Sequence, residues 1–182
     1  MSDEDEFRVL VRQESSRLLR LAYGVCGRLP SAEDALQTAL ERAYASWHLV
    51  RAADDRPAYL RRMVIREAVK EARRGARYST LEDATPPEGA TPIVPSEERL
   101  DLADALKALT PKQRAVVVLR YLDDQSVAEV ARILRVSEGT VKRQCYDAVR
   151  TLRPLLRPTS PADAPEGVAD GFAESITRRR DA

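Results

Sequence analysis

The sequence has little glycine, few aromatic residues and no long apolar run. It contains 7 glycines among 182 residues and 5% aromatic side chains, and it is rich in Ala, Leu, Arg and Glu, which suit helices better than sheets. No apolar stretch approaches the ~20 residues needed to cross a bilayer. The acidic start, Met1 to Glu6, lacks the basic and apolar regions of a secretory signal. We therefore predict an all-α, cytoplasmic protein with no membrane segment.

Cysteine and histidine are also scarce, with 2 cysteines and 1 histidine in the chain. His48 has no Cys or second His near it in the sequence, so we expect a surface histidine and assign no metal ligands. Cys26 and Cys145 each fall on the apolar stripe of a predicted helix. This position predicts buried free thiols, and a disulfide is not expected in a reducing compartment. No cofactor is predicted.

The usual catalytic patterns are missing as well. The sequence has no glycine-rich phosphate loop and no cluster of metal ligands. Its Ser, Cys and His residues form no recognisable nucleophile signature. The adjacent acids Asp54–Asp55 and Asp123–Asp124 lie in predicted loops and are typical of turns. An enzyme would need a site assembled across the fold without any local signal, so we expect a protein that is not an enzyme.

Charge is unevenly distributed although its sum is small. The formal net charge is +1, but acids crowd the first six residues and the segment from Glu82 to Asp104. Basic residues crowd the segments Arg56–Arg77 and Lys142–Arg157. A nearly neutral chain with two basic segments can still present an electrostatic footprint for nucleic acid.

Three helices are predicted in the first half, over residues 7–26, 31–47 and 57 to about 77. Gly27 is a stop signal for the first helix, Ser31 is a candidate N-cap for the second, and Pro57 suits the first turn of the third. A polar loop is predicted from His48 to Arg56. The apolar positions of the second and third helices recur at helical spacing: Leu36, Ala39, Leu40, Ala43, Tyr44 and Trp47, then Ile65, Ala68, Val69, Ala72 and Ala76.

The second half begins after a segment without helical period. Residues 79–95 contain four prolines and several acids, which is typical of a flexible linker. A second helical module is predicted over residues 96–157. Thr110–Gln113 and Ser126–Glu129 each have the pattern of a capping box. Val116, Leu119 and Leu122 continue the helix that starts at Pro111, and Ser137 is the predicted cap of a longer helix. Residues 158–182 have too few large apolar residues to order themselves and are predicted to be a disordered tail.

The segment from Gln125 to Arg153 has the pattern of a helix-turn-helix unit. Such a unit places its second helix in the major groove of DNA, where Lys and Arg can pair with guanine edges or phosphates. The alternative is an ordinary helical hairpin with a solvated charged face. Asp147 falls on the same side as two of the basic residues, where it should repel phosphate or orient a neighbouring Arg. The face opposite the buried stripe carries Glu138, Thr140, Lys142, Arg143, Tyr146 and Arg150.

A second basic feature lies on the third predicted helix. Five cations spaced by three or four residues share one face, which suits a phosphate backbone, although such runs are often only solvated surface. Glu67 and Glu71 are expected to fall off this stripe without neutralising it directly. The stripe, named the basic stripe below, consists of Arg62, Arg66, Lys70, Arg73 and Arg77.

Three stretches together resemble the extracytoplasmic-function (ECF) sigma factors, a group of the sigma-70 family. They are Leu18–Trp47, with Ser31-Ala32-Glu33-Asp34-Ala35-Leu36-Gln37 inside it, then Asp55–Val64, and finally Leu109–Lys142. A proline-rich linker separates the second stretch from the third, as in the family. The wording Tyr59-Leu60-Arg61-Arg62-Met63-Val64 is similar to an actinobacterial subgroup.

The resemblance implies a role for each part of the chain. Residues 1–78 would form the region 2 domain, which binds core RNA polymerase and opens the minus-ten element, and residues 96–157 the region 4 domain, which reads the minus-35 element. An anti-sigma factor would be a further candidate partner. The implied polymerase-binding residues are Asp34, Gln37 and Arg42. The implied minus-ten residues are His48, Arg51, Arg56, Arg62, Arg66, Lys70 and Arg73, and the implied minus-35 residues are Ser137, Glu138, Thr140, Lys142, Arg143, Tyr146 and Arg150.

Two other classes of function fit parts of the same pattern. A sigma-like adaptor would keep the protein-binding surface without driving initiation, and the intact basic face of the last helix argues against it. A stand-alone regulator would bind duplex DNA without polymerase. The pattern from Asp34 to Trp47 and the basic stripe argue against that alternative.

Overall fold

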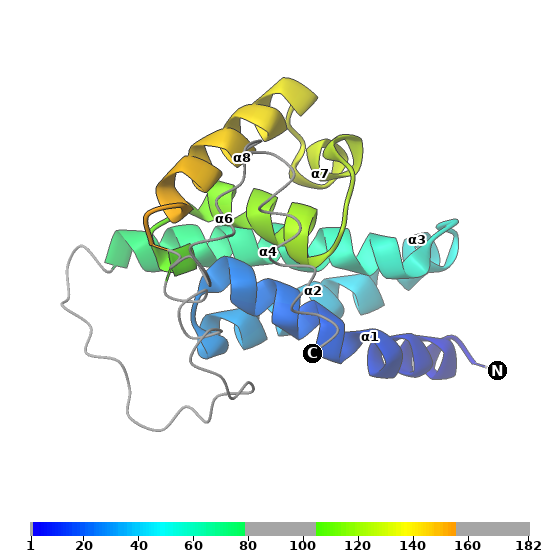
Figure 1. Ribbon diagram of the computed structural model, residues 1–182. Helices are drawn as coiled ribbons and strands as arrows, with labels where there is room; N and C mark the ends of the chain where they lie inside the picture. The colour runs from blue at the N-terminus through cyan, green and yellow to red at the C-terminus, as the bar shows by residue number, and fades with distance from the viewer. Residues whose placement is uncertain (1, 79–104, 156–182) are drawn as a thin grey trace, which may run out of the picture. The chain divides into compact units, whose positions relative to one another are not determined.

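The computed structural model describes residues 2–78 and 105–155, and every secondary-structure element within these ranges is helical (Figure 1). The chain divides into two compact units, one containing the described residues 2–78 and the other the described residues 105–155. The predicted linker, residues 79–95, and the predicted tail, residues 158–182, lie outside the described residues. No described helix is long and apolar enough to span a bilayer. The all-α fold class is confirmed.

Helix α1 (Asp3–Cys26) begins four residues before its predicted start. Ser2 forms a capping box with Asp5, because the Asp5 N–H donates to Ser2 Oγ (3.2 Å) and the Ser2 N–H donates to Asp5 Oδ2 (3.1 Å). The acidic run carries no apolar period, but its charges are favourable at a helix N-terminus. Gly27, with φ of 73°, ends the helix as predicted.

The next boundaries differ from those predicted. Helix α2 (Leu29–Ala45) starts with Arg28 as N-cap and Pro30 in its first turn, so the prediction of Ser31 as N-cap was wrong. Part of the predicted polar loop is helical, because α3 (Trp47–Arg51) follows the break at Ser46. Helix α4 (Arg56–Tyr78) begins after Asp55, whose Oδ1 accepts the Ala58 N–H at 2.8 Å.

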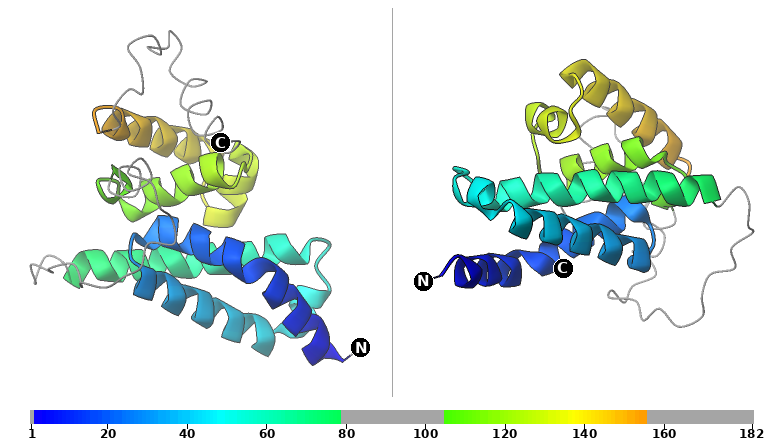
Figure 2. Two further views of the ribbon diagram at one scale, coloured as in Figure 1. Left: turned by 60° about the horizontal axis from the view of Figure 1, so that its bottom comes forward. Right: turned by 180° about the vertical axis from the view of Figure 1, so that it is seen from behind.

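Helices α1, α2 and α4 pack against one another to form the N-terminal unit (Figures 1 and 2). Small side chains on the inner face of α2 allow this close packing: Ala32, Ala35, Ala39 and Ala43 are all 0% exposed. Trp47 is buried, as predicted. Two residues predicted inside lie outside instead, since Tyr44 is 53% exposed and Ala76 is also exposed. Both are at the edge of their apolar stripes.

In the described part of the C-terminal unit, residues 105–107 are helical and are followed by α6 (Pro111–Val117), the π-helical turn η1 (Val118–Leu122), α7 (Val127–Leu134) and α8 (Glu138–Leu152). The capping box of Thr110 and Gln113 is confirmed. Ser126 accepts the Glu129 N–H, while the Glu129 carboxylate contacts Arg132. The core includes Leu106, Val117, Ala148 and Leu152.

The turn η1 changes which side chains face the core. The Asp123 N–H donates to the Val118 carbonyl at 3.1 Å, five residues back, so this turn is wider than an α-helical turn. Leu119 is 0% exposed and Leu122 is 42% exposed. Leu122 therefore does not share the buried face of Val116 and Leu119, with which the sequence pattern grouped it, because that pattern assumed an unbroken α-helical period.

Replacing Leu119 with Ala should destabilise the C-terminal unit by about 2–5 kcal/mol, since the change leaves a cavity in a closed core. The same replacement at Leu122 should change stability by about 0.5 kcal/mol or less, because that side chain is already in contact with water. Urea unfolding followed by hydrogen exchange of the α8 amides would measure both. Equal losses in the two variants would contradict the wider turn.

Candidate nucleic-acid interface

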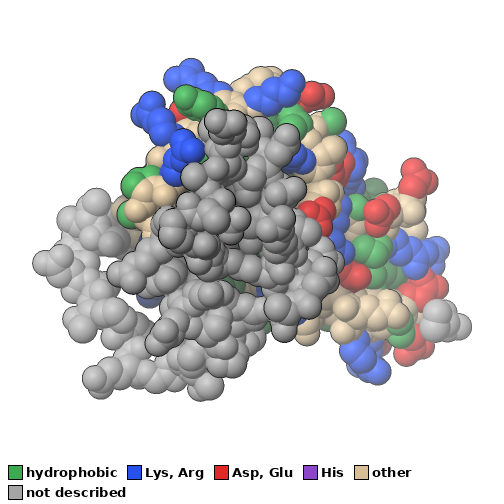
Figure 3. Space-filling view, in the orientation of Figure 1, with side chains coloured by type: hydrophobic (Ala, Val, Ile, Leu, Met, Phe, Trp, Pro, Cys, Tyr) green, Lys and Arg blue, Asp and Glu red, His purple; other side chains and the backbone are tan. Residues whose placement is uncertain are grey.

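The outer face of α8 is the most exposed basic surface that the sequence predicted. All seven side chains of the predicted minus-35 set are exposed, with Tyr146 at 65%. The opposite face is held in the core by Val141, Ala148 and Leu152, each 0% exposed. Figure 3 shows Lys and Arg side chains gathered over the part of the surface where α8 lies. The helix can therefore meet a partner without unpacking its core.

The turn before α8 fixes how this face is presented. Arg135 adopts a left-handed backbone with φ of 55° at the end of α7, and the Val136 N–H donates to the Ala131 carbonyl at 3.0 Å. Ser137 Oγ then accepts the Thr140 N–H at 3.1 Å. The hydroxyl of Ser137 thus caps α8, and α7 packs on α8. A capped helix, a tight turn and a second capped helix form the predicted helix-turn-helix geometry.

Asp147 lies beside a basic residue of this face. Its Oδ2 is 3.9 Å from the Nε of Arg143, whose side chain is 83% exposed. An ion pair this open contributes little to stability. Asp147 therefore lies where it can orient Arg143, one of the two effects that the sequence predicts for it.

Neither cysteine forms a disulfide. Cys26 is buried, with Sγ 3.6 Å from the Ser31 carbonyl oxygen and 3.5 Å from that of Ala68. Cys145 is only half-buried, so the prediction of a fully buried thiol was wrong there. Its Sγ is 3.1 Å from the Tyr121 hydroxyl, and burial raises the pKa of Tyr121 above its ordinary value. A neutral tyrosine therefore supports the inner side of α8.

The basic stripe of α4 is less open than the sequence predicts. Lys70 and Arg73 are exposed, while Arg62 and Arg66 are half-buried. The guanidinium of Arg62 lies over the Tyr59 ring, 5.2 Å from its centroid. The side chain of Arg77 lies outside the described residues. The described part of the stripe therefore contains two exposed and two half-buried cations, and an aromatic ring lies beside its first cation.

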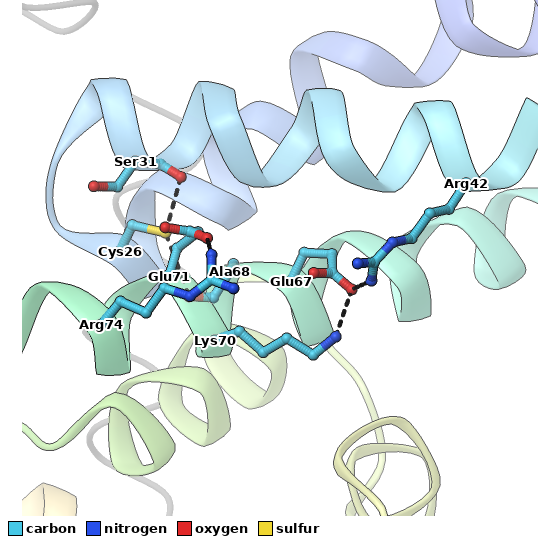
Figure 4. A network of polar contacts seen from close by, with 8 residues as sticks. All are labelled: Cys26, Ser31, Arg42, Glu67, Ala68, Lys70, Glu71 and Arg74. Carbon is cyan, nitrogen blue, oxygen red and sulfur yellow. Dashed lines mark hydrogen bonds and ion pairs between the residues drawn. The ribbon is translucent and has the colours of Figure 1, made fainter.

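Glu67 pairs directly with the basic stripe, contrary to the prediction. Its Oε1 is 2.8 Å from Lys70 Nζ and also accepts a hydrogen bond from Arg42 on α2 (Figure 4). The pairing with Lys70 arises because residues three apart are neighbours on a helix surface. The pairing with Arg42 depends on the packing of α2 against α4, which the sequence pattern does not reveal. One carboxylate therefore joins two predicted binding residues.

The predicted polymerase-binding residues occupy two places on α2. Asp34 and Gln37 are exposed and share an outward face with Glu41, whose Oε1 accepts a hydrogen bond from Gln37 Nε2 at 3.0 Å. Arg42 instead extends toward α4, where it contacts Glu67. Glu41 is not among the residues that the sequence predicts for this face, although its spacing of four from Gln37 places the two side by side on a helix. We name Asp34, Gln37 and Glu41 the α2 face.

Two further arginines lie where α3 leads into α4. Arg51 pairs with Asp3 (Nη1 to Oδ1, 2.5 Å) and Arg56 pairs with Glu6 (Nη1 to Oε2, 3.1 Å). The Arg56 guanidinium also lies 6.0 Å from the centroid of the Trp47 ring. His48, nearby on α3, is exposed. The structure therefore collects the predicted minus-ten residues along α3 and α4, with acids of α1 beside two of them.

Comparison with known proteins identifies the family. Residues 10–78 match the family described as Sigma-70 region 2, and residues 99–152 match Sigma-70, region 4. The RNA polymerase sigma-E factor of Streptomyces antibioticus is 39% identical over 83% of this chain and 84% of its own. The ECF RNA polymerase sigma factor SigL of Mycobacterium tuberculosis is 34% identical over 82% of this chain and 88% of its own. The chain belongs to the ECF sigma factors.

The sigma factor's fold is also found in a solved structure. The sigma factor RpoE of Bartonella quintana, in complex with the anti-sigma factor NepR, has a TM-score of 0.68. It is 23% identical, and the match covers 85% of this chain and 99% of that one. Proteins of this family bind core RNA polymerase, recognise promoters and start transcription, and this is the function of the present chain. Among the described residues, no group of His, Cys, Asp and Glu could hold a metal ion.

Proposed function

We propose that this sigma factor uses three separate surfaces to bind polymerase and promoter DNA. The α2 face docks on core polymerase, α3 and α4 hold the melted minus-ten strand, and α8 reads the minus-35 duplex. The protein acts by binding alone, without catalysis of its own, in the cytoplasm beside the polymerase. The observation that carries this proposal is the capped, exposed basic face of α8, because a major-groove reader needs such a helix.

The two DNA-binding surfaces suit different forms of DNA. Lys142 and Arg143 lie close to the start of α8, where a recognition helix contacts base edges and phosphates. The basic stripe is longer and is accompanied by Tyr59, an arrangement that suits a single strand held by its backbone and stacked bases. Each surface alone would bind weakly. Both gain effective concentration when they sit on one polymerase.

Replacing Lys142 and Arg143 with Ala should lower transcription from minus-35-dependent promoters at least about tenfold, the scale of one lost base contact. Co-elution with sigma-free core polymerase should be unchanged. Run-off transcription and size-exclusion chromatography would measure the two effects. The matched control replaces Lys112 and Arg132, two exposed cations outside α8, and should transcribe normally. A comparable loss of polymerase binding in the α8 variant would contradict the assignment.

Replacing Arg62, Arg66 and Lys70 with Ala should impair promoter opening more than polymerase binding, because the stripe would no longer hold the single-stranded backbone. We expect permanganate reactivity of promoter thymines to fall about tenfold or more, the effect of losing two or three phosphate contacts. The control replaces Arg8, Arg12 and Arg20, three exposed cations of α1. Normal permanganate reactivity in the stripe variant would refute this role of α4.

Replacing Asp34 and Gln37 with Ala should weaken binding to core polymerase about tenfold, the scale of an interface hot spot. Titration of labelled sigma factor with sigma-free core polymerase would measure the dissociation constant. The control replaces Gln13 and Glu14 on α1, which likewise removes one amide and one carboxylate from the same unit. Equal affinities of the two variants would move the polymerase contact away from the α2 face.

The same experiments separate this proposal from its alternatives. Co-elution with polymerase but no transcript from a genomic library would favour an adaptor. A tight complex with duplex DNA in the absence of polymerase would favour a stand-alone regulator. An anti-sigma factor is a candidate partner, since the structurally similar RpoE of Bartonella quintana was solved with one.

A further inference from the structure

We propose that the acidic first turn of α1 masks the minus-ten surface by occupying two of its arginines. Asp3 and Glu6 would take the places of DNA phosphates on Arg51 and Arg56. This inference rests on the proposed function, because it needs these arginines to bind DNA. Its basis is the pair of contacts already described, at 2.5 Å for Arg51 and 3.1 Å for Arg56.

These contacts are made by the tertiary fold and are not local helix pairs. The partners are 48 residues apart for Arg51 and Asp3, and 50 residues apart for Arg56 and Glu6. Figure 3 shows acidic and basic side chains side by side where the start of α1 lies near α3. The first turn of α1 thus places acidic groups against a basic surface whose residues lie about 50 positions later in the sequence.

The acids are held in place by neighbouring contacts. Phe7 packs between two aromatic rings, with centroids 5.1 Å from Tyr44 and 5.5 Å from Trp47. The capping box of Ser2 and Asp5 keeps the first turn helical. Because this turn is anchored on both sides, Asp3 and Glu6 lie at the arginines without a large loss of chain entropy on pairing.

Carboxylate and phosphate oxygens are recognised by guanidinium groups in the same way. A DNA strand must therefore displace Asp3 and Glu6 before it can use Arg51 and Arg56. The displaced carboxylates would stay at a helix N-terminus, where the positive end of the helix dipole and water stabilise them. The exchange is therefore reversible, and it favours DNA when polymerase holds the strand nearby at high effective concentration.

The same contacts allow an alternative to masking, in which the acids orient the arginines for DNA binding. The two roles predict opposite effects of neutralising the acids. Masking predicts tighter DNA binding after neutralisation, and orientation predicts weaker binding. Asn and Gln keep the size of Asp3 and Glu6 and remove only the charge, so the double change Asp3→Asn, Glu6→Gln separates the two roles.

The experiment measures binding of the full chain, without polymerase, to a fluorescently labelled oligothymidylate by anisotropy. Asp3→Asn, Glu6→Gln should lower the Kd about threefold to tenfold, the range that two surface ion pairs can supply. The matched control is Glu4→Gln, Glu14→Gln, which removes the same charge from α1 but affects the pairs with Arg8 and Arg17. The control should change the Kd by less than about twofold, as expected for screened charges that do not touch the site.

Salt dependence gives a second readout that a merely structural change would not produce. The unmasked arginines should release more counterions on binding, so the slope of log K against log salt should steepen by up to about 1.4 for two single-strand phosphate contacts. The masking proposal would be overturned by an unchanged or higher Kd in Asp3→Asn, Glu6→Gln. An equal decrease of the Kd in the control variant would overturn it as well.

A third variant distinguishes failure of the masking from failure of the proposed function. Adding Arg51→Ala and Arg56→Ala to the neutralised chain should return the Kd to the wild-type value or above, since the gained contacts depend on these arginines. If the neutralised chain binds more tightly and the arginine changes leave that gain intact, both the masking and the minus-ten role of Arg51 and Arg56 are wrong. If the arginine changes weaken binding but neutralisation never strengthened it, the minus-ten role stands and the masking fails.

Discussion

The N-terminal unit depends on the close packing of α2 against α1 and α4. The inner face of α2 is formed by alanines that are fully buried, and such small side chains let helix backbones approach closely. This approach brings Arg42 of α2 to Glu67 of α4. The same unit holds the first turn of α1 beside Arg51 and Arg56. A larger residue at Ala39 would separate the helices and with them the polar contacts on which the binding surfaces depend.

Several cations on the surface of this unit are paired with carboxylates of the same unit. Lys70, Arg51 and Arg56 each have a carboxylate partner within the unit. Surface ion pairs of this kind contribute about 0–1 kcal/mol, so a phosphate strand can displace them. Under the proposed masking, a protein with a net charge of +1 would keep low affinity for nucleic acid when free and still hold a promoter in a larger assembly.

The C-terminal unit holds one helix, α8, rigidly in place. Ser137 caps α8, Arg135 turns the chain, and Leu152 anchors the far end in the core. The half-buried Tyr121 supports the inner side of α8 through its contact with Cys145. With its backbone fixed by these contacts, α8 exposes its charged side chains on the face that we propose binds DNA.

The helical class, the helix-turn-helix and the outer face of α8 could be predicted from the sequence, because caps and apolar periods are local signals that need no knowledge of the partner helix. It also carried enough family pattern for membership in the ECF sigma factors to be predicted. Three local features were not predicted, because none of them follows an apolar period. They are the acidic first turn of α1, the start of α2 at Leu29 with Pro30 in its first turn, and the π-helical turn η1. Which charges pair across the unit depends on how its helices pack. The pairs Glu67–Arg42, Asp3–Arg51 and Glu6–Arg56 join residues 25 to 50 positions apart, and no spacing rule within one helix reaches that far.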